Sequence, residues 1–390
     1  IIENNNIHDS KCSGITLGKE RGTGHNVWSK DPSYDGSLHY IEVTFRALRN
    51  GWNKDNIGSH IVRNNTIYNC EQTGICGSFG AAFSTIQHNH IYNIHQKKQF
   101  TGAELAGIKL HAAIDAVLEN NRIHDVGAFG YWMDWMTQGT RITRNLLYRN
   151  DWQDLFFEVD HGPFLVDNNI FLSVQSIATQ SEGGAFIHNL ISGSMTVWSD
   201  PSRFTPYHLP HSTEIAGLAT VVAGDDRYYN NIFIGKGADS TAFPGQKFGL
   251  LVYNTIPADK SPKLKSHTNL NDRWPIWIEH NLYYNGAQPW NEEKDVVQNS
   301  RFNPDIKLLE EGNHVYLQFV SDETLSLQKT ELITTAKLGS TKLPKAYYEN
   351  PDGKPLSIDT DYSGSKRSNT HPTPGPFENP GAGSVKIKVW

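Results

Sequence analysis

The chain has 390 residues, with 35 basic and 41 acidic side chains and a formal net charge of −6. This mild negative balance argues against a nucleic-acid-binding surface, and no apolar run approaches the roughly 20 residues of a membrane-spanning helix. A chain of this length is large for one ordinary globular domain, but it suits a solenoid, in which each turn contacts only its neighbours.

A short motif, apolar-x-x-Asn-x-apolar, recurs along most of the chain. The shorter intervals between its copies cluster at 21–24 residues, and the longer ones fit turns that carry insertions. The marker asparagines are Asn5, Asn65, Asn89, Asn121, Asn145, Asn168, Asn189, Asn230 and Asn281.

The motif predicts a parallel β-helix. Its alternating apolar residues are typical of strands with one buried face, and asparagine tolerates the left-handed backbone of a bend between strands. Stacked asparagines can also satisfy one another's amide groups along the axis. Leucine-rich and hexapeptide solenoids fit less well, because leucine does not dominate and no six-residue period is present.

The domain organisation follows from where the motif continues and where it fades. Residues 1–295 are expected to form the coils that carry an active-site face, and residues 296–390 a set of C-terminal coils and an extended tail wrapping the helix. Long insertions at about 13–60, 94–110 and 191–227 are where function is expected to concentrate.

Two carboxylates occupy equivalent places in the repeat. Asp134 and Glu158 each lie 13 positions after a marker, Asn121 and Asn145 respectively. On adjacent turns their side chains would face one another at the strand spacing of about 4.7–4.9 Å, close to the roughly 5–5.5 Å that separates the carboxyl groups of retaining glycosidases. Two stacked carboxylates can also arise by chance in a solenoid, but like charges placed opposite each other destabilise a sheet and so need a reason.

The segments around the pair are rich in aromatic residues. Asp134 lies between Trp132 and Trp135, and Glu158 follows Phe156 and Phe157. An apolar setting raises a carboxyl pKa, as a general acid near neutral pH requires. The two settings are too alike in sequence to assign a role to either carboxylate.

Further polar and aromatic residues near this face are candidates for sugar contacts. His111 lies 10 residues before Asn121 and is expected to extend the face by one turn; a buried structural histidine is the alternative. The segment "YHLPHSTE" has three groups that could bind a metal, but its spacing is not that of a zinc site, so sugar contacts are favoured and no metal is expected. The substrate-binding candidates are Glu104, His111, Trp135, His161, His208, His211 and Glu214.

The segments "GAELAGIKLHAAID", "GYWMDWMTQGTRITRN" and "DLFFEVDHGPFLVDNNIF", followed by "TPYHLPHSTE" and "GDDRYYNNIF", resemble glycoside hydrolase family 120. The resemblance implies a right-handed parallel β-helix and β-xylosidase activity without a cofactor. It implies that the aspartate of "YWMDWM", Asp134, is the nucleophile and that the glutamate of "FFEVDHGP", Glu158, is the acid/base. Members of the family carry additional N-terminal coils and an inserted β-sandwich, which are expected to be missing from this chain.

Together these features favour a retaining, exo-acting β-xylosidase that releases xylose from short xylo-oligosaccharides. A polysaccharide lyase on the same fold and a non-catalytic carbohydrate-binding solenoid are the alternatives. The expected partner is an oligosaccharide, with neither nucleic acid nor membrane; a homo-oligomer or association with an N-terminal portion is left open. The odd cysteine count (Cys12, Cys70 and Cys76) slightly favours the cytoplasm, but the localisation is otherwise unknown.

Overall fold

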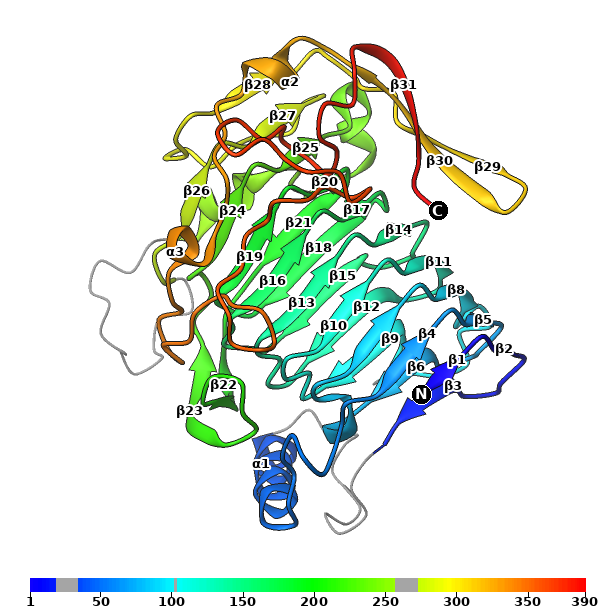
Figure 1. Cartoon of the computed structure of the whole chain (residues 1–390), viewed down its shortest axis with the longest axis vertical. Coiled ribbons are helices and arrows are strands. Elements are labelled where there is room, and N and C mark those ends of the chain that lie inside the picture. Colours follow the sequence, from blue (N-terminus) through cyan, green and yellow to red (C-terminus); the bar gives the residue numbers. More distant parts are fainter. Residues whose placement is uncertain (19–33, 102–103, 257–272) are drawn as a thin grey trace.

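The computed structural model describes residues 1–18, 34–101, 104–256 and 273–390 of the chain. Within these residues, three parallel sheets run alongside one another (Figure 1). Up to residue 197 the chain contributes one strand to each sheet in turn, and later strands extend only the first two of these sheets. This arrangement confirms the parallel β-helix predicted from the asparagine motif. Residues 19–33 and 102–103 of the predicted insertions lie outside the described residues.

The three sheets differ in length. The first contains β1 (Ile2–Glu3), β4 (Ile61–Arg63), β7 (Thr85–Gln87), β10 (Val117–Glu119), β13 (Thr140–Thr143), β16 (Phe164–Asp167), β19 (Gly184–Ile187), β24 (Arg227–Tyr229) and β26 (Trp277–Glu279). The second contains β2 (Asn6–His8), β5 (Thr66–Tyr68), β8 (His90–Ile94), β11 (Arg122–Val126), β14 (Leu146–Tyr148), β17 (Ile170–Phe171), β20 (Leu190–Ile191), β25 (Ile232–Ile234), β27 (Leu282–Tyr284) and β28 (Val297–Asn299). The third contains β3 (Ser13–Leu17), β6 (Thr73–Gly77), β9 (Ala106–His111), β12 (Phe129–Asp134), β15 (Leu155–Glu158), β18 (Gln175–Gln180) and β21 (Ser194–Val197).

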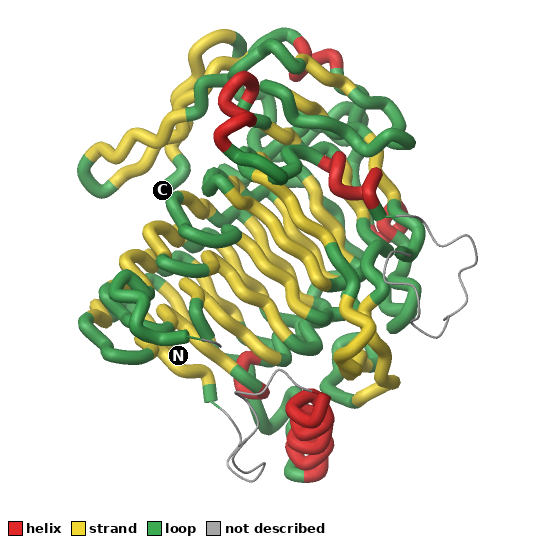
Figure 2. The backbone as a smooth tube through the Cα atoms, turned by 180° about the vertical axis from the view of Figure 1, so that it is seen from behind, coloured by secondary structure: helices red, strands yellow, loops and turns green. Residues whose placement is uncertain are grey.

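The remaining elements lie outside the three sheets. They are α1 (Tyr34–Arg49), the 3-10 turns η2 (Phe79–Ala81), η3 (Gly237–Ala242) and η4 (Leu250–Thr255), the hairpin β22 (Asp200–His208) and β23 (Ile215–Val221), the antiparallel strands β29 (Lys307–Glu311), β30 (His314–Ser321) and β31 (Gly383–Lys388), and the short helices α2 (Thr324–Leu327) and α3 (Thr335–Leu338). Helix α1 packs against β22, and both project beyond the same edge of the parallel sheets (Figures 1 and 2). None of the helices that the structure describes has the length and apolar character needed to cross a bilayer.

The interior of the solenoid is filled by columns of apolar side chains. In the second sheet, successive turns place one residue directly above the last, and the column includes Ile67, Ile91, Ile123, Leu147, Phe171, Ile191, Phe233 and Tyr283. All of these side chains are fully buried. Because each turn buries its apolar face only against its neighbours, the length of the stack does not depend on a single globular core.

A ladder of asparagine side chains runs through the same interior. Each Nδ2 donates to the Oδ1 of the asparagine on the next turn, at 2.9–3.2 Å, except that of the last asparagine, which donates to Glu293. The ladder contains Asn5, Asn65, Asn89, Asn121, Asn145, Asn169, Asn189, Asn231 and Asn281. Two of the predicted markers were therefore one residue early. Asn168 and Asn230 instead take the left-handed backbone (φ 56° and 58°) that turns the chain into the ladder position.

Replacing Asn145 by alanine is expected to lower the stability of the fold clearly. Its Oδ1 accepts from the backbone nitrogen of Asn121 (2.8 Å), and its Nδ2 donates to the carbonyl of Leu118 (3.0 Å). The substitution leaves both buried groups unsatisfied, at about 1–3 kcal/mol each. Thermal unfolding followed by circular dichroism measures the effect, with the exposed Asn6→Ala as the control. An unchanged midpoint for the Asn145 variant would contradict the proposed contribution of the ladder.

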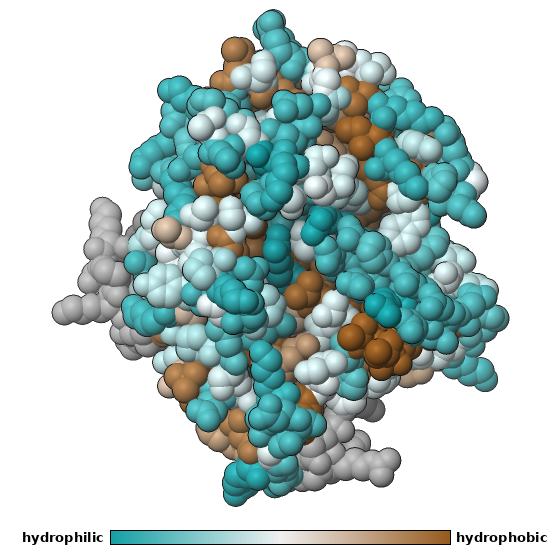
Figure 3. All heavy atoms as spheres, viewed as in Figure 1, coloured by the Kyte–Doolittle hydropathy of each residue, from teal (hydrophilic) through white to brown (hydrophobic). Residues whose placement is uncertain are grey.

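The C-terminal segment covers the outer faces of the later turns. Ile333, Leu338, Tyr348, Leu356 and Ile358 pack on Leu165, Ile187 and Tyr229 of the first sheet. Strands β29, β30 and β31 form a separate antiparallel sheet beside the second parallel sheet (Figure 1). Hydrophilic side chains dominate the face seen in Figure 3, and hydrophobic ones gather there in smaller patches. The three cysteines are all unpaired; Cys70 is buried, Cys76 is half-buried and Cys12 is exposed.

Candidate active site

The two carboxylates predicted to be equivalent lie side by side at the ends of adjacent strands. Asp134, the last residue of β12, is in register with Glu158, the last residue of β15. His111 at the end of β9 is in register with Asp134 on the other side, and Gln180 of β18 with Glu158. The prediction that these groups share one face on successive turns is confirmed. The face is the outer one, because the alternate residues, such as Met133 and Phe157, are buried in the core.

A second column lies two residues earlier on the same face, as the period of a strand requires. It contains Lys109 of β9, Trp132 of β12 and Phe156 of β15. The Lys109 ammonium is 2.5 Å from Asp134 Oδ2 and 3.2 Å from the centre of the Trp132 ring. The side chain of Lys109 is only 1% exposed, so this is a buried ion pair with an added cation–π contact.

Asp134 is held in its ionised form. Burial alone would raise the pKa of its carboxyl, but Lys109, His111 and Arg203 outweigh that effect and lower the pKa to about 2. Its Oδ2 faces Lys109, whereas no described group is within hydrogen-bonding distance of its buried Oδ1. The carboxylate therefore combines a full negative charge with an oxygen that is not engaged in a hydrogen bond, as a nucleophile requires.

The pKa of Glu158 is shifted in the opposite direction to that of Asp134. Burial and the neighbouring charge of Asp134 raise the pKa of Glu158, although Arg203 and Lys109 oppose them. The indole nitrogen of Trp132 donates to Glu158 Oε2 at 2.8 Å, and Arg203 donates to Oε1. Two adjacent carboxyls with pKa values pushed apart are the arrangement that lets one act as a base or nucleophile and the other as an acid.

Glu104 and His111 lie beside the pair, as predicted. His111 Nε2 is 3.2 Å from Glu104 Oε1 and 3.5 Å from Asp134 Oδ2. Burial opposes the charge on Glu104, but His111 and Lys109 outweigh it and lower the pKa of Glu104. The ring of Tyr40 in α1 stacks on His111, with centroids 5.6 Å apart, so the helix forms one wall of the site.

Three other residues predicted to bind the substrate have buried side chains. Trp135 donates its indole N–H to Thr205 of β22 at 2.9 Å and is 3% exposed. His161 has Glu182 at 2.8 Å from one nitrogen and the carbonyl of Ala219 at 3.2 Å from the other. His208 is fully buried, and burial lowers its pKa to about 4. In this structure all three side chains make hydrogen bonds with residues of hairpin β22–β23, and their contact with a sugar stays a prediction.

His211 and Glu214 lie at the tip of the hairpin, in a different place. They line a separate groove of about 580 Å³ together with residues of α1 and the loop after it. His211 bridges Asp115 (3.0 Å) and Glu349 (3.2 Å), and its hydrogen bond to Asp115 raises its pKa to about 9. The structure therefore does not group these two residues with the catalytic pair.

Two cations of the site, Lys109 and Arg203, carry no predicted role. Lys109 is expected near this face from the sequence, because it precedes His111 by two residues and must share its face of the strand. Arg203 belongs to an insertion and carries no repeat phase, so nothing in the sequence aligned it with Glu158. It reaches the pair because β22 lies beside the ends of strands of the third sheet, where Thr205 accepts a hydrogen bond from Trp135.

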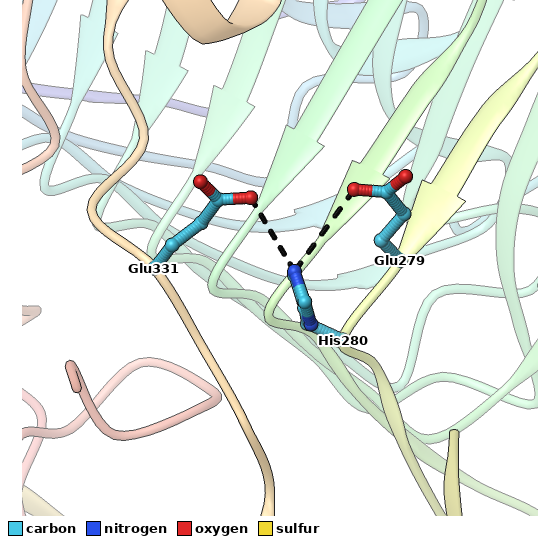
Figure 4. A group of neighbouring side chains, drawn as sticks. All are labelled: Glu279, His280 and Glu331. Carbon is cyan, nitrogen blue, oxygen red and sulfur yellow. Dashed lines mark ion pairs between the residues drawn. The ribbon is translucent and has the colours of Figure 1, made fainter. Parts of the chain in front are cut away.

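One group of side chains among the described residues could hold a cation. Glu279, His280 and Glu331 lie close together where the C-terminal segment passes β26 (Figure 4). The Lys337 ammonium is already 2.9 Å from Glu279 and 2.5 Å from Glu331. Because that ammonium neutralises both carboxylates, the group is explained as an ion-pair network that fastens the C-terminal segment to the solenoid.

Comparison with known proteins agrees with the parallel β-helix fold. A family described as "Right handed beta helix region" matches residues 2–194, and no curated protein gives a significant match. A solved structure of XylC in complex with xylose is 44% identical, with a TM-score of 0.91 over the whole of this chain. The alignment covers 61% of the XylC chain, so the present sequence spans about that share of its relative. This chain is a right-handed parallel β-helix and is similar over its whole length to XylC.

Proposed function

We propose that this chain carries the catalytic face of a retaining, exo-acting β-xylosidase that acts on short xylo-oligosaccharides. The observation that carries the proposal is the in-register pair Asp134 and Glu158, with one pKa lowered and the other raised. The xylose complex of the relative XylC supports a xylose-containing substrate. Neighbouring strands lie about 4.7–4.9 Å apart, which matches the carboxyl separation of retaining rather than inverting enzymes.

In the first half of the reaction Asp134 attacks the anomeric carbon of the terminal xylose. The glycosidic bond breaks, and its electron pair moves to the leaving oxygen, which takes the proton of Glu158. Lys109 keeps Asp134 ionised and aligned, and the apolar surroundings of Glu158 favour its protonated form. The products of this half are the shortened oligosaccharide and a xylosyl ester of Asp134.

In the second half a water molecule replaces the leaving group. Glu158, now ionised, removes a proton from the water as its oxygen attacks the anomeric carbon, and Asp134 leaves as a carboxylate. Two inversions at the same carbon give a β-xylose. Glu104 and His111 lie beside Asp134, where they can bind hydroxyl groups of the terminal sugar.

Exo action is supported by the walls around the pair. Helix α1 places Tyr40 over His111, and the hairpin places Arg203 against Glu158. An open solenoid face would accept a polymer along its length, whereas a site closed at one side by two projecting elements favours a chain end.

A panel of aryl glycosides tests the proposal, with the anomer of the first sugar released followed by NMR. We expect cleavage of aryl β-xylosides with β-xylose as the first product, and no cleavage of the matched aryl α-xylosides. Release of α-xylose would instead indicate an inverting enzyme. An unsaturated product that absorbs in the ultraviolet would indicate a lyase, and internal cuts in long xylan before free xylose would contradict exo action.

A further inference from the structure

Arg203 reaches the catalytic pair from outside the stacked sheets. It lies on β22, at an irregularity in the pairing with β23 between Asp200 and Thr205. The Asp200 carboxylate holds this bend, because its Oδ1 accepts from the backbone nitrogens of Ser202 (2.9 Å) and Arg203 (3.2 Å). Gln180, the residue in register with Glu158, donates to Asp200 Oδ2 at 2.8 Å. The position of Arg203 is thus tied to the same column of residues that carries the pair.

The guanidinium of Arg203 faces both carboxyl groups. Its Nη1 donates to Glu158 Oε1, and its Nη2 is 3.8 Å from Asp134 Oδ1. Lys109, by contrast, makes its ion pair with Asp134. Lys109 therefore pairs with the proposed nucleophile, Asp134. Arg203 lies between Asp134 and Glu158, the two carboxyl groups that exchange charge during the proposed reaction.

The charge on this pair moves during double displacement. In the proposed mechanism Asp134 is ionised and Glu158 holds a proton before the substrate reacts. When the leaving oxygen takes that proton and the Asp134 oxygen bonds to the anomeric carbon, the ester is neutral and Glu158 carries the negative charge. The second half-reaction returns the charge to Asp134. The total charge of the pair stays the same in both states, but its place shifts from one turn of the solenoid to the next.

We propose that Arg203 is a positioning residue that stabilises this charge on Glu158 in the covalent intermediate and so speeds release of the sugar. The inference rests on the roles of Asp134 and Glu158 proposed above. In the free enzyme the same guanidinium still contacts Asp134 electrostatically, so it need not leave the site as the charge moves. A fixed cation between the two positions requires no reorganisation during the reaction, which is why such groups are effective.

The pH dependence follows from the groups that face Glu158. Burial and Asp134 raise the pKa of Glu158, while Arg203 and Lys109 lower it. The buried carboxyl of Asp160 lies nearby and has a pKa raised by burial. Removing Arg203 therefore raises the pKa of Glu158. Glu158 therefore stays protonated to higher pH, as the first half-reaction requires. Its ionised form, which the second half-reaction requires, is reached only at higher pH.

The test compares Arg203→Gln and Arg203→Lys with wild type in the full-length protein. With a dinitrophenyl β-xyloside, whose leaving group needs no proton, we expect Arg203→Gln to show a burst of phenolate followed by turnover that is at least about 10-fold slower, equivalent to about 1.4 kcal/mol. The alkaline limb of kcat/KM for an unactivated xyloside should shift upward. Arg203→Lys should restore most of the turnover, and Leu218→Gln, an exposed position on β23, serves as the hairpin control.

Each outcome separates the two proposals. If wild type cleaves β-xylosides with retention but Arg203→Gln shows no burst and no shift of the alkaline limb, the role of Arg203 is wrong and the proposed function stands. Equal slowing in the Arg203→Gln and Arg203→Lys variants without a pH shift would indicate a purely structural role. If wild type releases α-xylose or no sugar, the double-displacement assignment fails and the inference about Arg203 fails with it.

Discussion

Replacing Asp134 by asparagine is expected to lower kcat/KM for aryl β-xylosides by at least about 10⁴-fold, the scale of loss when a covalent nucleophile is removed. Asparagine has nearly the same shape, so the sugar can still bind, but its amide oxygen carries no charge and cannot form the ester. Initial rates with a nitrophenyl β-xyloside measure the loss, and titration with xylose measures binding. Binding that survives with activity lost distinguishes catalysis from a carbohydrate-binding solenoid. Retention of full activity would remove Asp134 from the mechanism.

The Asp134 variant needs a matched control because it leaves a buried cation unpaired. Lys109 is 1% exposed, and breaking a buried ion pair from one side costs about 3–5 kcal/mol. The double variant Asp134→Asn, Lys109→Met removes both charges and should recover most of the lost thermal stability without recovering activity. Recovery of activity together with stability would mean that the single variant failed only through misfolding.

Replacing Glu158 by glutamine is expected to give a loss that depends on the leaving group. For xylobiose, whose leaving oxygen must be protonated, we expect kcat/KM to fall by about 10²–10⁴-fold, the usual contribution of general acid catalysis. For a dinitrophenyl β-xyloside the first half-reaction needs no acid, so kcat/KM should change little while kcat falls. The reason is that the missing base slows attack by water on the xylosyl ester.

Azide provides the second measurement for the Glu158 variant. This anion needs no general base, so it should restore turnover of the dinitrophenyl substrate and yield β-xylosyl azide. Wild type, which has its base, should show no such acceleration. A Glu158→Gln variant that lost activity equally for all leaving groups and did not respond to azide would argue that Glu158 positions the site rather than transferring a proton.

The fold could be predicted from the sequence because its determinants recur within one turn. The asparagine ladder repeats mostly at 20–32 residues, and each member makes the same two contacts with the next turn. The one-residue error at Asn168 and Asn230 arose where two asparagines are adjacent, so the pattern alone could not tell the bend from the ladder position. That error did not disturb the register of Asp134 and Glu158, whose turns are both marked by the correct residue.

The same periodicity located part of the site and missed the rest. His111, Asp134 and Glu158 end three consecutive strands, so their alignment follows from the repeat. His161 and His208 are candidates because polar groups in insertions often contact ligands. In the structure each is buried and makes a hydrogen bond with a backbone carbonyl of the hairpin. Burial of a histidine depends on contacts far away in the chain, which periodicity does not encode.

By itself, the sequence determined that this protein is a solenoid and that two carboxylates lie on adjacent turns, because strand period and turn length are local properties. Only the tertiary structure decided how those carboxylates differ. Lys109 is paired with Asp134 across 25 residues, and Arg203 contacts Glu158 across 45. The physical reason is that a pKa responds to burial and to every nearby charge. Burial and Asp134 raise the pKa of Glu158, while Arg203 lowers it from a hairpin that packs against α1.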